Sequence, residues 1–87
     1  MTFEGSIVKE QGVTFGIVIV KESALRNHAT ANDLIPTFER VLGVAPVVLM
    51  AQNGRGVPTY YGRKDIVAFL AKIDFRRIPW KKYTYTA

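Results

Sequence analysis

The chain contains no cysteine and no long apolar segment, and these absences exclude several kinds of protein. Without cysteine there is no disulfide framework, no thiolate zinc site and no cysteine nucleophile. The longest apolar runs, at 17–20 and 44–51, are far shorter than the ~20 residues that cross a bilayer. Residues 1–5 lack the basic and apolar regions of a secretory signal. We therefore expect a cytoplasmic protein without a membrane partner.

Residues that bind metals or perform acid–base chemistry are also few and widely spaced. The seven acidic residues form no D-x-D or E-x-x-H pattern. The single histidine, His28, lies in a polar stretch with no nucleophile arranged beside it, and we expect it in a solvent-exposed loop. Tyr60 and Lys64 have the Tyr-x-x-x-Lys spacing of short-chain dehydrogenases, but the G-x-G-x-x-G dinucleotide fingerprint is missing. The sequence predicts no enzyme, no metal site and no cofactor.

Acidic residues are rarest in the second half of the chain, which is strongly basic. From Ala51 onward there are eight basic and two acidic residues, a net charge of +6, whereas residues 1–50 carry −1. Aromatic side chains alternate with these cations, and a surface that is both basic and aromatic suits an acidic or flat partner. The candidate residues for binding an anion or a partner are Arg55, Arg63, Lys64, Arg76, Arg77, Trp80, Lys81, Lys82, Tyr83 and Tyr85.

The first half of the chain predicts a hairpin followed by a helix. Length and an apolar content of 48% indicate a single domain, 1–87. Apolar β-branched runs at 7–9 and 13–20 predict two antiparallel strands, and the second is apolar on both faces, as a central strand would be. Residues 21–31 show no clear period and are expected to be a polar connection.

The predicted helix of the first half has recognisable signals at both ends. Asn32 and Asp33 can cap its beginning, which would place Pro36 in the first turn, where proline is tolerated. Gly43 can end it in a left-handed conformation. An apolar strand is expected to follow at 47–51.

The second half predicts one further helix and one further strand. Apolar residues at 66, 69, 70 and 73 follow helical spacing within 63–73. The tail, 78–85, is rich in aromatic residues and threonine with a proline near its start, which favours an edge strand. The order ββαβαβ predicts an α+β or small α/β fold, a two-layer sandwich in which a mixed sheet of about four strands carries two helices.

The glycine-rich segment 54–64 has two interpretations. It joins a buried strand to the start of a helix, a position where open α/β sheets often bind anions. A phosphate-binding P-loop is excluded, because Gly56 and Gly62 have the wrong spacing and no hydroxyl residue follows Lys64. The segment is either an ordinary connection or an anion site that uses Arg55, Arg63 or Lys64.

The tail strand decides between the hypotheses for function. Alternation along a strand places Trp80, Lys82 and Thr84 on one face, and Lys81, Tyr83 and Tyr85 on the other. The rings either pack on the sheet or stack on an exposed base. We expect a non-enzymatic interaction module that forms a homodimer or binds another protein. The alternatives are nucleic-acid binding through the basic and aromatic residues of 55–85, and an enzyme or phosphate-binding domain that uses 54–64.

Overall fold

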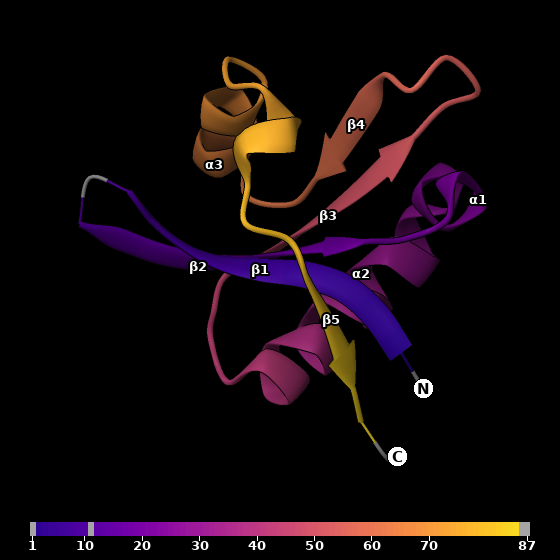
Figure 1. Ribbon diagram of the computed structural model, residues 1–87. Coiled ribbons are helices and arrows are strands. Elements are labelled where there is room, and N and C mark those ends of the chain that lie inside the picture. The colour runs from indigo at the N-terminus through magenta and orange to yellow at the C-terminus, as the bar shows by residue number, and fades with distance from the viewer. Residues whose placement is uncertain (1, 11, 86–87) are drawn as a thin grey trace.

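The computed structural model describes residues 2–10 and 12–85, which form a mixed five-stranded sheet with helices on it (Figure 1). The strands are β1 (Thr2–Glu10), β2 (Val13–Ile19), β3 (Val47–Gln52), β4 (Pro58–Tyr61) and β5 (Lys81–Thr84). The helices are α1 (Glu22–Arg26), α2 (His28–Leu42), α3 (Lys64–Leu70) and the short 3₁₀ helix η1 (Phe75–Arg77). The strand order is β4-β3-β2-β1-β5, with β2 and β3 parallel and the other neighbours antiparallel. The predicted α+β class and mixed sheet are confirmed.

The sheet has apolar side chains on both faces, as β3 illustrates. Its residues alternate between two apolar clusters: Leu49 packs with Phe38 of α2, and Val48 and Met50 pack with Leu70 of α3. Helix α2 therefore covers one face, while α3 and η1 cover part of the other (Figure 1). Strand β4 and the short helix α1 were not among the elements expected from the sequence.

The predicted hairpin and the central position of its second strand are confirmed. β1 and β2 are antiparallel, and the pair Glu10–Val13 closes the hairpin. β2 lies between β1 and β3, so side chains on both of its faces are covered. Ile17 and Val18, which point to opposite faces, are both fully buried. A strand with neighbours on both sides and helices over both faces must be apolar throughout, which explains the run in the sequence.

The prediction of an irregular connection at 21–31 was wrong, because most of this stretch belongs to α1 and to the first turn of α2. Asn27 caps α2: its Oδ1 accepts hydrogen bonds from the backbone amides of Ala29 (3.0 Å) and Thr30 (3.2 Å). The helix therefore begins before Asn32 and Asp33. The first turn carries little apolar surface, so hydrophobic periodicity could not reveal it.

Two further details of α2 follow from its earlier beginning. Pro36 lies inside the helix, not in the first turn as predicted. Gly43 ends the helix as predicted: it has a left-handed φ of 71°, and its amide donates to the carbonyl of Glu39 at 2.9 Å.

The second half also differs in detail from its prediction. The glycine-rich segment 54–64 contains β4, because its Thr-Tyr-Tyr run pairs with β3. The helix predicted over 63–73 ends at Leu70, and Asp74 then caps η1 by accepting from the amide of Arg76. The tail forms an edge strand as predicted, although its regular part is β5 alone. Within the described ranges, no helix is long and apolar enough to cross a bilayer.

Candidate interaction surfaces

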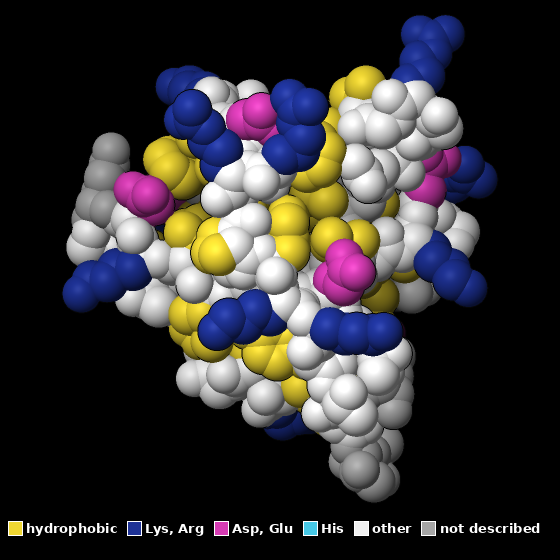
Figure 2. All heavy atoms as spheres, viewed as in Figure 1, with side chains coloured by type: hydrophobic (Ala, Val, Ile, Leu, Met, Phe, Trp, Pro, Cys, Tyr) yellow, Lys and Arg dark blue, Asp and Glu magenta, His cyan; other side chains and the backbone are white. Residues whose placement is uncertain are grey.

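The predicted basic residues lie on several separate elements. All of them are exposed to solvent. They occupy the β3–β4 turn (Arg55), the start of α3 (Arg63 and Lys64), η1 (Arg76 and Arg77) and the edge strand β5 (Lys81 and Lys82). Figure 2 shows lysine and arginine side chains over widely separated parts of one face, with carboxylates among them. The positive charge of the second half therefore does not form one continuous patch on this face.

The two ends of the 54–64 segment are held apart. The side-chain oxygen of Asn53 accepts hydrogen bonds from the backbone amides of Arg55 (2.8 Å) and Val57 (3.0 Å), which closes a tight turn. Strand β4 then separates this turn from Arg63, whose Nε lies 2.8 Å from a carboxylate oxygen of Asp65. Arg55 therefore lies at one end of β4, whereas Arg63 and Lys64 lie at the other end, so the alternative cations of the anion hypothesis belong to two separate places.

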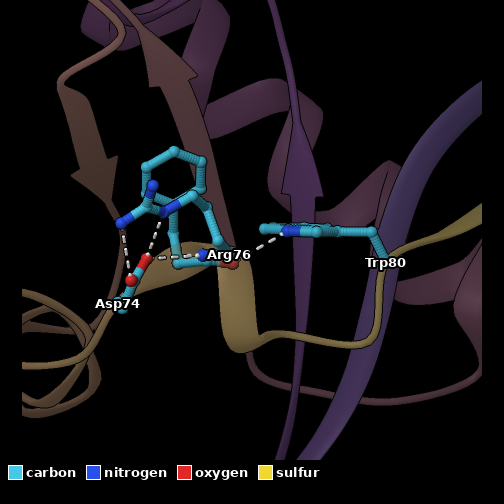
Figure 3. A network of polar contacts seen from close by, with 4 residues as sticks. Asp74, Arg76 and Trp80 are labelled. Atoms are coloured by element: carbon cyan, nitrogen blue, oxygen red, sulfur yellow. Dashed lines mark hydrogen bonds and ion pairs between the residues drawn. The ribbon is translucent and has the colours of Figure 1, made fainter.

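The η1 turn contains a network of polar contacts that involves Asp74 and Arg76 (Figure 3). One carboxylate oxygen of Asp74 accepts hydrogen bonds from the backbone amide and from the Nε of Arg76, both at 3.0 Å. The other oxygen accepts a hydrogen bond from Nη2 of Arg76 at 2.9 Å. The hydrogen bond from the Arg76 side chain lowers the pKa of Asp74, and the carboxylate in turn raises the pKa of Arg76. The positive charge of Arg76 is therefore paired with Asp74 within the turn.

The aromatic residues of the tail are half-buried and attach the tail to the rest of the chain. Tyr83 stacks on Phe3 with ring centroids 5.2 Å apart, and Tyr85 meets the same ring edge-on at 5.9 Å. On the other face, Trp80 packs in the cluster beneath α3, and its indole Nε1 donates to the carbonyl of Phe75 at 3.0 Å (Figure 3). The alternation predicted for the tail is confirmed. The partial burial of Trp80, Tyr83 and Tyr85 favours a packing role for these rings over base stacking.

The tyrosines of β4 also make specific contacts. The hydroxyl of Tyr61 donates to Oδ1 of Asn32 in α2 at 2.8 Å, and its ring lies 5.0 Å from that of His28. His28 is exposed as expected, but it is the first residue of a helix and not part of a loop. The hydroxyl of Tyr60 is buried and has no hydrogen-bond partner among the described residues, and burial, followed by the charge of Asp74, raises its pKa. Residues 2–10 and 12–85 contain no group of three or more side chains placed to bind a metal ion.

The outer edge of β1 is only partly occupied, which the sequence did not predict. β5 pairs with Thr2–Gly5 alone, so the rest of β1, Ser6–Glu10, has no strand on its outer side within the described residues (Figure 1). The amide of Gly16, which is paired with Ile7, donates to the carbonyl of Pro46 on the other side of β2, so Ile7 and Gly16 exchange no backbone hydrogen bonds. Alternation then turns the N–H and C=O groups of Ile7 and Lys9 outward. Within residues 2–10 and 12–85, Ile7 is also one of three large apolar residues that are substantially exposed, at 45%.

An apolar groove is the second surface that sequence patterns did not indicate. It has a volume of about 660 Å³ and lies between the first residues of β1, the end of β2 and the helices α1 and α2. Its apolar lining consists of Phe3, Ile19, Val20, Ala24, Leu34 and Phe38. These residues come from four elements and are spread over residues 3–38. Their assembly therefore leaves no local motif.

The length of β1 was underestimated from the sequence. The interruption Glu4-Gly5-Ser6 has low strand propensity, and it limited the predicted first strand to 7–9. The observed strand of nine residues is more than twice as long as β5, and this mismatch creates the open half.

Comparison of the chain with protein families, with curated proteins and with solved structures gives no match.

Proposed function

We propose that the chain is a non-enzymatic interaction module that self-associates by pairing the open half of β1 with the same segment of a second copy. The observation that carries the proposal is the unpaired outer edge of Ser6–Glu10, which includes the exposed Ile7. An open strand edge offers backbone donors and acceptors to another strand, and extending a sheet in this way is a recurrent mode of recognition.

The open segment is suited to a two-fold antiparallel contact. The outward N–H and C=O groups belong to Ile7 and Lys9. All of these groups form hydrogen bonds when Ile7 of each copy faces Lys9 of the other. Val8 then faces its counterpart across the axis, and four backbone hydrogen bonds join the two sheets. This register keeps the two copies of Lys9 from facing each other directly.

The expected dimer is weak and responds to salt. Four hydrogen bonds with a small apolar contact form an interface below the standard size, so we expect a dissociation constant of roughly 10–100 µM. Each copy carries a net charge of +5, and the two copies repel each other. Salt screens this repulsion and should strengthen the dimer. Binding to nucleic acid has the opposite dependence, because salt weakens contacts with phosphate.

The register predicts how charge at position 7 alters the dimer. In Ile7→Lys, a lysine faces the partner's Lys9 twice across the axis, whereas Ile7→Glu creates two opposite-charge pairs at the same places. We expect Ile7→Lys to weaken the dimer at least about tenfold and Ile7→Glu to retain it. Sedimentation velocity over a concentration series at two salt concentrations measures both effects.

The matched control is Val57→Lys, which places the same charge at an exposed apolar residue in the β3–β4 turn. We expect this variant to dimerise like the unchanged protein. A monomer at all concentrations, or equal behaviour of Ile7→Lys and Ile7→Glu, would contradict the proposal. Binding of labelled oligonucleotides that falls steeply with salt, without a dimer, would favour the nucleic-acid alternative instead.

A further inference from the structure

The geometry points to a second, independent site: we infer that the apolar groove between β1, β2, α1 and α2 binds a single-chain amphiphile with an anionic head, such as a fatty-acid carboxylate. The groove volume of about 660 Å³ is typical of small-molecule sites, which span roughly 300–1,000 Å³. Such sites combine an apolar wall with a few polar groups that orient the ligand.

The inner wall of the groove is suited to a hydrocarbon chain. Phe3 and Phe38 have their ring centroids 4.9 Å apart at the base, and Leu34 of α2 and Ile19 of β2 extend the apolar surface. Phe3 and Phe38 are buried in the core cluster, which packs them and fixes the base. In Figure 1 the surrounding elements are the first part of β1, α1 and α2, on the side of the sheet away from α3.

The charge at the rim selects an anionic head. Lys21 is the charged residue that lines the groove, and the remaining polar lining comes from the hydroxyl residues Thr2, Ser23 and Thr30. Lys21 forms no ion pair with any residue in the described ranges. The neighbouring carboxylate, Glu22, is paired with Arg26 and does not compete strongly for the lysine. A carboxylate head at this rim would meet one ammonium group and up to three hydroxyls.

The occupant follows from the combination of an apolar wall and a cationic rim. A purely apolar ligand would leave Lys21 unused, and a small hydrophilic anion would leave the wall in contact with water. An aliphatic chain that ends in a carboxylate satisfies both. Each buried methylene is expected to strengthen binding about fourfold, so affinity should rise steeply with chain length until the groove is filled.

Isothermal titration calorimetry with two probes tests the inference. Dodecanoate and undecyltrimethylammonium have the same eleven-carbon tail and opposite heads, and both are used as monomers below their micellar concentrations. We expect dodecanoate to bind one to one and at least about fivefold more tightly than the cationic probe. Decanoate, which has two methylenes fewer, should bind roughly fifteenfold more weakly than dodecanoate.

Two substitutions separate this site from general attraction to a basic protein. Lys21→Gln should weaken dodecanoate binding about threefold to tenfold, whereas Lys72→Gln, which removes the same charge from an exposed residue just after α3 on the other face of the sheet, should leave it unchanged. Ala24→Trp places an indole on α1 within the groove lining and should abolish binding.

The folded state of each variant is checked by circular dichroism. With ¹⁵N-labelled unchanged protein, dodecanoate should shift the amide signals of Ser23, Thr30 and Leu34, a readout that requires no substitution. Equal affinity for the two probes, equal effects of Lys21→Gln and Lys72→Gln, or amide shifts located elsewhere would overturn the inference. Self-association through β1 uses other residues, so either result leaves the proposed dimer to its own test.

Discussion

Phe3 should be the residue on which attachment of the C-terminal tail depends most. Its ring lies 4.9 Å from Phe38, 5.2 Å from Tyr83 and 5.9 Å from Tyr85. Through these contacts one side chain of β1 connects α2 to β5 and to the residue that follows it. Leucine at this position would keep most of the buried apolar area and remove all three ring contacts.

The expected loss of stability in Phe3→Leu can be estimated from these contacts. An aromatic pair contributes ~0.5–1.5 kcal/mol beyond its burial, so three pairs give a loss of roughly 2–4 kcal/mol in the free energy of unfolding. For a domain of this size, that corresponds to a decrease in Tm of roughly 10–25 °C. Urea unfolding followed by the fluorescence of Trp80, which lies immediately before β5, measures the loss.

A matched control separates ring contacts from general packing. Phe69 of α3 is half-buried, and its ring pairs with no other ring within residues 2–10 and 12–85. We expect Phe69→Leu to cost less than about 1.5 kcal/mol, because the exchange alters shape more than burial. Equal losses in the two variants would refute the reasoning, since they would show that the ring cluster adds nothing beyond apolar area.

Two further predictions concern the backbone of the sheet and the η1 turn. Gly5→Ala should lower the free energy of unfolding by about 1–3 kcal/mol, because the new Cβ would lie 2.8 Å from the carbonyl oxygen of Ile17. Gly54→Ala is the control, because the space around Gly54 is open, and it should be nearly neutral. Urea unfolding measures both variants. Arg76→Gln should raise the lowered pKa of Asp74 toward its ordinary value, as measured by carboxyl ¹³C chemical shifts across a pH titration. A lowered pKa means that the interaction stabilises the folded state above the unfolded-state pKa and is lost as the pH falls through the folded-state pKa, so the difference in stability between the two proteins should vanish in acid. An unchanged Asp74 titration in Arg76→Gln, or a Gly54→Ala variant as unstable as Gly5→Ala, would contradict these explanations.

Much of the local structure was predictable because it depends on neighbouring residues. The glycine at position 43 adopts the left-handed conformation that ends α2, and the alternation along the tail assigns its side chains to the correct faces. The beginning of α2 was missed because Asn27, Asn32 and Asp33 are all good capping residues. Choosing among them depends on which turn packs against the sheet, and the first turn contributes only one buried side chain, Ala31.

The candidate surfaces were less predictable because they combine residues from distant segments. The basic residues were identified correctly as exposed, but β4 separates Arg55 from Arg63, and the tail inserts its rings beside Phe3. The open half of β1 results from a difference in length between two paired strands, and the apolar groove results from how α1 and α2 sit on the sheet. None of these relations is encoded in a short window of sequence.

The sequence by itself determined the α+β class, the hairpin, the central strand and the edge position of the tail, because periodicity, turn residues and side-chain volume act over a few residues. Tertiary structure alone decided which part of β1 the tail covers and where the cations lie. The physical reason is that strand register and helix placement are set by packing between segments far apart in the chain, and the same local pattern is compatible with several such arrangements.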